Sequence, residues 1–586
     1  MRLSAKHEQR TVTYGNFTGG LNNTSVPEQI AENQLAECVN MEFNRATGAL
    51  ETCCGTAMVF KAPTEVSVDW ITYDGINNKF IFADLRTRKL YKTSLVDMTG
   101  TVANDCEFLG TLTGNLKPKS VQWEDGTLIA SGGKLQYWNG KELKILGVSF
   151  SDYSANWDYI GRIIWYWHVQ TRYNVGDVVR FDGKLYYCIT AHLSTYDAEL
   201  SKWVECSEVA LDYDKEFNQY DVVKYKDEYY VCNTAHRTGK GAPENCNGVF
   251  VKSGRVWVWY DYTLQCSAVG DEEDWGYDTT DDSSSKYIDV GYKDGENEHG
   301  FIVGVTALSS ALVILKNNGV VYKLTGDYPD WSLNEIARGI KPLNPESYIG
   351  TPNGVLIVGK SGMYMLETTD EYGDIKPTNL ASNIIGMFCL LTMDNTVVRF
   401  LPNLNQVWIT GLNNSVIVYS LDFKVFFERQ FNNMVSDVTT NTTEVFIARK
   451  DKVTRLTRGI YEDEKYSDDE APMSWSFQAK SLLSFYDILI KRFRVSYVPL
   501  MDEFDRAEIL IGDEKLILGM PDRINDSPLI FTNTTLIYND LGFIFETMTQ
   551  FNTTWAVYRK RVVDVKGKGY GSAISLNSIE IAVAEV

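Results

Sequence analysis

Short apolar segments alternate with turn residues along most of this chain. A strand-like run at residues 80–82 (Phe-Ile-Phe) is followed by a polar turn and a second run at residues 89–91 (Lys-Leu-Tyr). Similar pairs begin near residues 128, 256, 312, 355, 407 and 445. Apolar runs joined by Gly, Asn or Asp turns predict β-hairpins. Their recurrence predicts an all-β protein with a β-propeller-like domain of about six to seven four-stranded blades. A set of unrelated hairpins in β-sandwiches is the alternative.

The pattern also predicts how the chain is divided. The propeller is expected at residues 61–149 and 254–469, after an extended N-terminal arm at 1–60 with little core of its own. A short helix is predicted over residues 28–40. Beyond the propeller the hairpins stop, and alternating segments predict a β-sandwich-like domain at 470–586.

Two copies of one short pattern interrupt the propeller. The sequence Asp-Val-Val at residues 177–179 returns 44 residues later at 221–223, and an aromatic residue, Tyr, Cys and Ala-His recur at the same offset. A repeated pattern predicts a repeated small fold. We therefore expect a tandem insertion of two small β modules, a first at residues 150–206 and a second, degenerate copy at residues 207–253.

Composition and charge narrow the functional classes. The 586 residues are 44% hydrophobic and 13% aromatic, and the formal net charge of −21 argues against a uniformly basic nucleic-acid grip. The first residues lack the apolar core of a secretory signal, and no apolar run is long enough to span a membrane. Ten cysteines in a chain of this length do not indicate a disulfide scaffold. We expect synthesis in a reducing cytoplasm.

Two stretches of the host chain carry a resemblance. The first is FTGGLN at residues 17–22, and the second runs from RVWVW at 255–259 through SAVGD at 267–271 to residue 327. With the final segment at 571–581, they resemble the tail nozzle proteins (tail tubular protein B, or stabilisation proteins) of short-tailed bacteriophages. This resemblance implies a virion protein in a ring of six, with a DNA-conducting channel, that docks on a tail adaptor and carries fibres. It implies no catalytic residue.

The insertion carries a second resemblance. Its first copy has Trp167, then Tyr173, then Gly176-Asp177, and ends at Trp203, which resembles small chitin-binding-type carbohydrate modules of families 5 and 12. Such modules stack exposed aromatic rings on the faces of sugars. The resemblance makes Trp167, Tyr186 and Trp203 the candidate glycan-binding residues, with a miniature aromatic core as the alternative reading. In the second copy Tyr220 and Asp227 replace two glycines, and Phe250 is the nearest counterpart of Trp203.

The other candidate sites have weaker support in the sequence than the aromatic residues of the insertion. His192 and His236 occupy equivalent repeat positions, as do Cys188 and Cys232, and packing within each module is favoured for both pairs over a metal site or a bond between modules. The acidic run at 271–282 is favoured as a solvated loop over a calcium site because it lacks the order of a dedicated calcium loop. The densest basic cluster is a candidate contact to DNA or to a neighbouring subunit; it comprises Arg559, Lys560 and Arg561. A glycine-rich stretch at 567–571 is predicted to be a hairpin tip.

The sequence therefore predicts a structural virion protein rather than an enzyme. No nucleophile elbow, zinc-protease motif or phosphate-binding loop occurs, so we expect no catalytic residue, metal or cofactor. The expected function is a homo-oligomeric tail nozzle or hub ring through which DNA passes without specific binding. Its expected location is the virion tail, and its insertion would contact host glycan or tail fibres. The alternative is a secreted glycan-binding protein or glycosidase built on a propeller.

Overall fold

A computed structural model describes most of the chain and divides it into two compact units. Unit 1 comprises residues 1–111, 303–325 and 332–586, and unit 2 comprises residues 112–302 and 326–331. The described residues are 9–94, 106–147, 156–196, 199–211, 215–225, 228–237, 243–277, 280–291, 300–368, 375–457, 467–468, 471–500, 506–518, 530–539, 542–551, 557–558 and 561–585.

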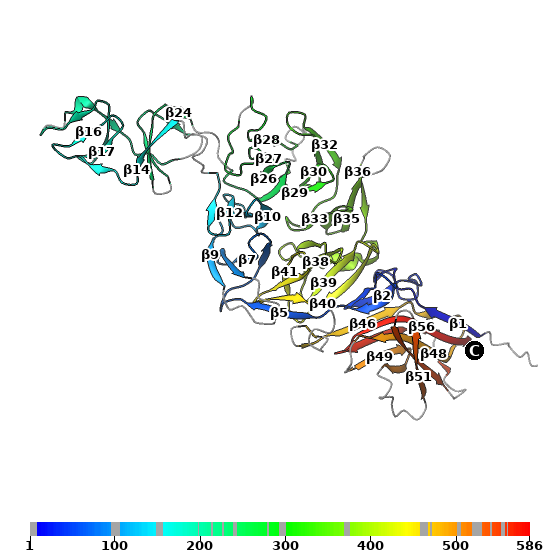
Figure 1. Cartoon of the computed structure of the whole chain (residues 1–586). Coiled ribbons are helices and arrows are strands. Elements are labelled where there is room, and N and C mark those ends of the chain that lie inside the picture. Colours follow the sequence, from blue (N-terminus) through cyan, green and yellow to red (C-terminus); the bar gives the residue numbers. More distant parts are fainter. Residues whose placement is uncertain are drawn as a thin grey trace, which may run out of the picture. The chain divides into compact units, whose positions relative to one another are not determined.

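The described part of the chain is almost entirely β-structure (Figure 1). Its single α-helix, α1, spans Ile385–Cys389, and short 3-10 turns lie at Leu200–Lys202 and Ser382–Ile384. Among the described helices, none has the length and apolar character needed to cross a membrane.

Seven groups of four paired strands follow one another in the described part of the host chain, two in unit 2 and five in unit 1, and the last two groups of unit 1 are parts of larger sheets. Those of unit 2 are β10 (Lys119–Trp123), β11 (Gly126–Ala130), β12 (Gln136–Trp138) and β13 (Leu143–Ile145), then β25 (Gly248–Lys252), β26 (Arg255–Tyr260), β27 (Thr263–Cys266) and β28 (Lys286–Asp289). Those of unit 1 are β6 (Trp70–Asp74), β7 (Lys79–Asp84), β8 (Lys89–Ser94) and β9 (Glu107–Thr111); β29 (Ile302–Leu308), β30 (Ala311–Lys316), β31 (Val321–Thr325) and β32 (Ser332–Ala337); β33 (Tyr348–Thr351), β34 (Gly354–Gly359), β35 (Gly362–Thr368) and β36 (Ile375–Asn379); β37 (Val398–Leu401), β38 (Gln406–Leu412), β39 (Ser415–Ser420) and β40 (Val425–Gln430); and β41 (Val435–Thr440), β42 (Val445–Arg449) and β43 (Lys452–Leu456) with β5 (Thr56–Lys61).

The last of these groups is closed by the start of the chain. Strand β5 pairs antiparallel with β43, with Thr56 opposite Leu456 and Lys61 opposite Lys452. In a propeller, a blade that combines strands from both ends of the chain links the first blade to the last. The predicted all-β, propeller-like fold of about six to seven blades is therefore confirmed, with seven groups of four paired strands in the described part of the host chain.

Apolar clusters hold successive blades together within each unit. In unit 1, Phe80 of β7 meets Phe446 of β42 edge-on, with ring centroids 4.7 Å apart. In unit 2, Leu128 of β11 shares a buried cluster with Val256 of β26. The turns follow local chemistry, since buried Asp84 accepts hydrogen bonds from the backbone N–H groups of residues 86 and 87 at a hairpin tip.

The N-terminal segment is built into unit 1 as strands. Strand β1 (Gln9–Tyr14) pairs with β56 (Ile574–Glu585), and β4 (Leu50–Thr52) joins β3 (Met41–Phe43) to the same strand β56. The predicted helix over 28–40 is wrong, because β2 (Leu35–Val39) lies there. That segment pairs with β40 on one side and β46 on the other. Two ladders outweigh the weak local preference for a helix.

Two sheets pack face to face in the C-terminal part of unit 1. One side of the sandwich is β46 (Ser474–Ala479), β55 (Val565–Tyr570), β49 (Arg506–Ile511) and β50 (Glu514–Leu518), and β2 extends this sheet continuously into β40 of the propeller. The other contains β56, β48 (Ile488–Pro499), β52 (Gly542–Phe551) and β51 (Ile530–Asn539). Buried Phe477 and Tyr497 come from the two sides. The predicted β-sandwich-like domain is present. Short pairings complete the region: β44 (Ser467–Asp468) with β45 (Ala471–Pro472), β47 (Leu482–Leu483) with β54 (Val562–Val563), and β53 (Val557–Tyr558) with β48.

The glycine-rich stretch at 567–571 is not a hairpin tip. Gly567 and Gly569 lie inside β55, between β46 and β49. A Cβ on Gly567 would lie 2.1 Å from the ring of Phe477, and one on Gly569 would lie 2.3 Å from that of Trp475. Glycine is required there because two rings cover the strand.

The insertion in unit 2 forms two small modules. The first has a four-stranded sheet, β15 (Trp165–Tyr166), β17 (Val178–Phe181), β18 (Lys184–Cys188) and β20 (Trp203–Cys206), and a ribbon of β16 (Arg172–Tyr173) with β19 (His192–Leu193). The second has a three-stranded sheet, β14 (Trp157–Gly161), β23 (Glu228–Cys232) and β22 (Val222–Tyr225), and a ribbon of β21 (Glu216–Phe217) with β24 (His236–Arg237).

Candidate functional site

The first module is organised around a buried tryptophan. Trp203 is 6% exposed, and its ring meets Tyr173 edge-on at 5.1 Å and His192 at 5.3 Å. Trp203 lies opposite Cys188 in the sheet, and both belong to one apolar cluster. Trp203 is therefore a core residue, and the miniature-core reading holds for this candidate. A ring without accessible faces cannot stack on a sugar.

The other two candidates pack against this core cluster on the same face of the sheet as Trp203, which is the outer face of the module. Trp167 contacts the ring of Phe181 at 5.4 Å, and Phe181 contacts the ring of Tyr186 at 6.3 Å. All three side chains are half-buried, so part of each remains accessible. The structure therefore brings Trp167 and Tyr186 together through Phe181, a residue that sequence reasoning did not select.

Trp165 extends this aromatic face and was also missed. Trp165 is 69% exposed and lies opposite Val179, which in turn lies opposite Tyr186. Residues opposite one another in neighbouring strands project to the same face. Its neighbour Tyr166, 66% exposed, belongs to the opposite face. A short parallel edge strand such as β15 has too little periodicity to predict this from sequence.

Local turn chemistry and an ion pair frame the aromatic face. Asp182 and Gly183 have φ of 47° and 77°, which makes the β17–β18 connection a two-residue turn of the type favoured in hairpins. After it, Lys184 Nζ lies 2.8 Å from Glu205 Oε1. Both side chains are more than half exposed. They therefore place hydrogen-bonding groups beside Tyr186, where a bound polar ligand could use them.

The second module repeats this design with one strand out of order. Trp157 lies opposite Cys232, as Trp203 lies opposite Cys188. Its ring meets Phe217 edge-on at 5.2 Å and His236 at 5.3 Å, which matches the surroundings of Trp203. Trp157 is therefore the spatial counterpart of Trp203, although it precedes the first module in the chain.

This arrangement changes the expected boundaries and equivalences. Phe250 is not the counterpart of Trp203, because it lies in β25 and pairs with Trp257 of β26 in a propeller blade. The segment 248–252 thus belongs to a blade rather than to the second module, and 157–161 belongs to the second module rather than to the first.

The two modules pack against each other through the faces opposite their own cores. Leu185 and Cys206 of the first module and Val222 and Val231 of the second form one buried cluster. Tyr220 joins this contact, with its ring 4.9 Å from that of Tyr187. Tyr220 occupies the position of Gly176 and keeps a positive φ of 74°. This conformation is unfavourable for a residue with a Cβ, and the contact across the modules supports it.

The repeated histidines and cysteines each serve their own module. Nδ1 of His192 donates to the carbonyl of Thr190 at 2.8 Å, and Nδ1 of His236 donates to that of Thr234 at 2.8 Å. Cys188 and Cys232 are free thiols. Burial raises the pKa of the Cys232 thiol to about 11. No disulfide therefore joins Cys188 to Cys232.

The acidic run finds partners within the chain, whereas most of the basic cluster lies outside the described residues. Glu272 accepts a hydrogen bond from the indole of Trp123 at 3.0 Å, and Glu273 accepts one from the backbone of Gly147 at 3.0 Å. Of the basic cluster, Arg559 and Lys560 lie outside the described residues, and Arg561 is exposed. Nearby Lys568 pairs with Glu508 at 3.0 Å.

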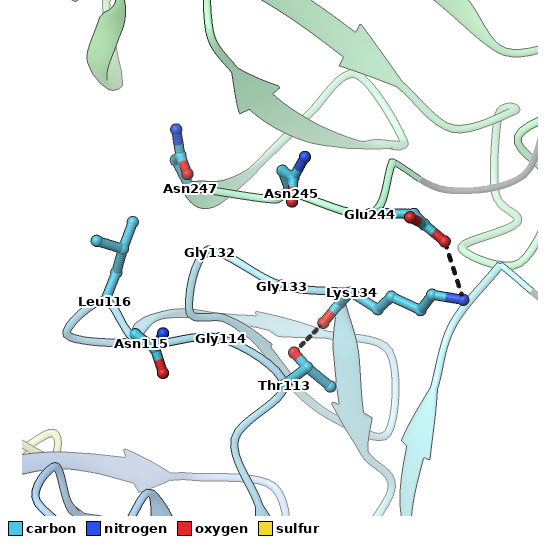
Figure 2. Close-up of a pocket in the computed structure, with 10 residues that line it drawn as sticks. All are labelled: Thr113, Gly114, Asn115, Leu116, Gly132, Gly133, Lys134, Glu244, Asn245 and Asn247. Carbon is cyan, nitrogen blue, oxygen red and sulfur yellow. Dashed lines mark hydrogen bonds and ion pairs between the residues drawn. The ribbon is translucent and has the colours of Figure 1, made fainter.

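A polar recess of about 680 Å³ lies in unit 2 where the insertion rejoins the blades (Figure 2). In Figure 2, Lys134 reaches Glu244 across its end, at 3.5 Å. Gly133 lies against a neighbouring loop, since a Cβ there would come within 2.4 Å of the Thr113 carbonyl carbon. The backbone N–H of Cys246 donates to the carbonyl of Gly133 at 2.9 Å, and the N–H of Gly132 donates to the carbonyl of Cys246 at 2.7 Å. The recess is therefore a seam between chain segments, and its lining includes no aromatic ring.

Among the comparisons with known proteins, one family match concerns this chain, and it falls within the first module of the insertion. Residues 166–200 match the model of carbohydrate-binding module family 5/12. A search of curated proteins gave no match.

Solved structures give low similarity over 69–72% of this chain. Saccharomyces cerevisiae Sqt1 is 10% identical with a TM-score of 0.35, covering 69% of this chain and 100% of Sqt1. BBS1N, solved in complex with ARL6DN, is 11% identical with a TM-score of 0.34, covering 69% of this chain and 98% of BBS1N. The computationally designed Ika8 protein is 11% identical with a TM-score of 0.28, covering 72% and 99%. Similarity at this level carries no functional conclusion.

Proposed function

We propose that the first module of the insertion binds a polysaccharide by stacking sugar rings on its outer aromatic face. The observation that carries this proposal is the row formed by Trp167, Phe181 and Tyr186, extended by the largely exposed Trp165. Pyranose faces present C–H groups that pack on aromatic rings, and these neighbouring half-buried rings, at interplanar angles of 69° and 63°, remain partly accessible to such contacts. The family 5/12 match over residues 166–200 supports the same ligand class.

The test is binding of the full-length protein to insoluble chitin and to peptidoglycan. Trp165→Ala should weaken binding by about 1–3 kcal/mol, by analogy with other ring-stacking contacts. Trp165 is largely exposed, so this substitution leaves the core intact. Tyr486→Ala, which removes a 63% exposed ring from the C-terminal domain, is the matched control. Wild-type affinity in Trp165→Ala and in Trp167→Ala would contradict the proposal.

For the host chain we propose a structural role in a virion, as a nozzle or hub ring of a short bacteriophage tail that conducts DNA. The support is the resemblance at residues 17–22 and 255–327, together with the net charge of −21, which would let DNA pass without adhering. The continuous sheet from β40 through β2 into β46 would also give such a scaffold stiffness. Adaptor and fibre proteins would be its partners, and catalysis has no part in this role.

Electron microscopy of the purified protein at high concentration, alone and with a candidate adaptor, tests this role. Closed rings with a central hole are the expected result. Single particles under both conditions would contradict it and would favour the alternative of a secreted glycan-binding protein or glycosidase. Hydrolysis of chitin or peptidoglycan that is lost on replacing one Asp or Glu would establish that alternative.

A further inference from the structure

The second module has an outward face of its own. The two sheets bury Leu185 and Cys206 against Val222 and Val231, so these faces are closed to a ligand. Side chains alternate between the two faces of a strand. The residues next to Val222 and Val231 therefore project away from the first module. The insertion thus has two outer faces that point in opposite directions, and each carries the core cluster of its own module with further aromatic rings beside it.

An exposed aromatic pair lies on that second face. Tyr159 of β14 lies opposite Tyr230 of β23, and their ring centroids are 5.5 Å apart at an interplanar angle of 61°. Tyr159 is 57% exposed and Tyr230 is half-buried. Tyr230 is the repeat counterpart of Tyr186, and both lie beside the core cluster of their module. Tyr159 occupies the place that Glu205 has beside Tyr186.

Hydrogen-bonding groups border this pair as they border the first face. The hydroxyl of Tyr230 donates to Glu228 Oε2 at 3.2 Å, and Arg162 Nε donates to Glu228 Oε1 at 3.1 Å. Glu228 follows the β22–β23 turn, as Lys184 follows the β17–β18 turn. The second face thus combines two rings with a charged pair at their edge. The first face has the same kind of combination, with the pair Lys184 and Glu205 beside its rings.

We infer that Tyr159 and Tyr230 form a second carbohydrate-stacking platform, so that one insertion holds two separate polysaccharide chains. The inference rests on the proposed function of the first module and takes the same ligand class. The family match covers only residues 166–200, and half of this platform comes from β14, which lies before that stretch. Because the two faces point apart, a single short oligosaccharide cannot span them. Each platform binds its own chain.

Isothermal titration of the full-length protein with N-acetylglucosamine hexasaccharide tests this. The expected stoichiometry is two per chain. Tyr159→Ala and Trp165→Ala should each weaken one of the two sites by about tenfold or more and leave the other unchanged. Tyr159→Phe keeps the ring and should bind as wild type. Tyr486→Ala controls for loss of an exposed tyrosine, and circular dichroism confirms folding of each variant.

The outcomes separate the two proposals. One site that is lost in Trp165→Ala and unaffected by Tyr159→Ala overturns the second platform and leaves the proposed function intact. One site that is lost only in Tyr159→Ala overturns the role of the first module and the two-chain arrangement. No heat of binding with the hexasaccharide, together with no retention on chitin or peptidoglycan, overturns both.

Discussion

Replacement of Trp157 should unfold the second module although Trp157 precedes the first in the chain. Trp157 is 5% exposed and packs on Phe217, His236 and Cys232. A tryptophan side chain buries on the order of 200 Å². At about 25 cal/mol/Å² its burial contributes about 5 kcal/mol. Truncations of large aromatic core residues cost about 3–5 kcal/mol, which agrees with this value.

Hydrogen exchange of the full-length protein, followed by mass spectrometry, locates this loss. In Trp157→Ala the amides of β22 and β23 should lose most of their protection, because their module then has almost no core left. The matched variant Trp203→Ala should act mainly on β17 and β18. Each variant also weakens the shared cluster around Leu185 and Val231, so a smaller change in the other module is expected.

Two results would refute the reasoning. If Trp157→Ala left residues 222–232 as protected as in wild type, β14 would not belong to the second module. If it instead exposed residues 178–188, the strand would serve the first module, as chain order suggests. The double variant Trp157→Ala with Trp203→Ala should remove protection throughout the insertion while the propeller blades of unit 1 keep theirs.

Three further predictions concern the host chain. Burial alone would raise the pKa of Asp468, but hydrogen bonds from Arg449 hold that pKa below its usual value. The ion pair therefore stabilises the fold above about pH 4, and this stabilisation is lost as the pH falls through the lowered pKa. Asp468→Asn should remove this acid dependence and lower the free energy of unfolding at neutral pH by about 3–5 kcal/mol, because it leaves Arg449 buried without its carboxylate. Denaturation at several pH values measures both effects. If the loss of stability at acid pH were the same as in wild type, Asp468 would not be its source. Gly567→Ala should destabilise the sandwich by about 1–3 kcal/mol in urea unfolding, because the added Cβ meets a ring at 2.1 Å; wild-type stability would show that the ring can move. Alkylation at pH 8 should modify exposed Cys389 first and Cys246 only after unfolding, since burial raises the pKa of Cys246 to about 12. If the two cysteines were alkylated at the same rate in the folded protein, Cys246 would not be buried.

Local patterns were sufficient for the blades. A hairpin depends on a turn and on two flanking apolar runs, and these signals lie within a few residues of one another. Asp84 at its turn and Phe80 and Phe82 in their strand are read directly from the chain. The 44-residue repeat likewise predicted two small modules, because each Asp-Val-Val segment carries its strand and its turn with it.

The candidate site was predicted only in part. The motif spacing selected Trp167 and Tyr186, which the structure places on one face, but also Trp203, which lies in the core. Spacing identifies which aromatic residues belong to the module. Whether a ring faces water or the core depends on which strands cover it. Trp165 and Tyr159 were missed for the same reason, since their exposure follows from the faces they share with neighbouring strands.

The sequence by itself thus determined the all-β character, the regular succession of hairpins and the presence of an aromatic repeat, because each of these depends on residues that are close to one another in the chain. The tertiary structure alone decided that β2 is a strand between two ladders, that β5 completes the last blade and that Trp157 completes the second module. In each case a segment takes its conformation from partners far away in the sequence. A pairing between distant segments leaves no periodicity in either of them, and its free energy appears only when the two surfaces are buried together.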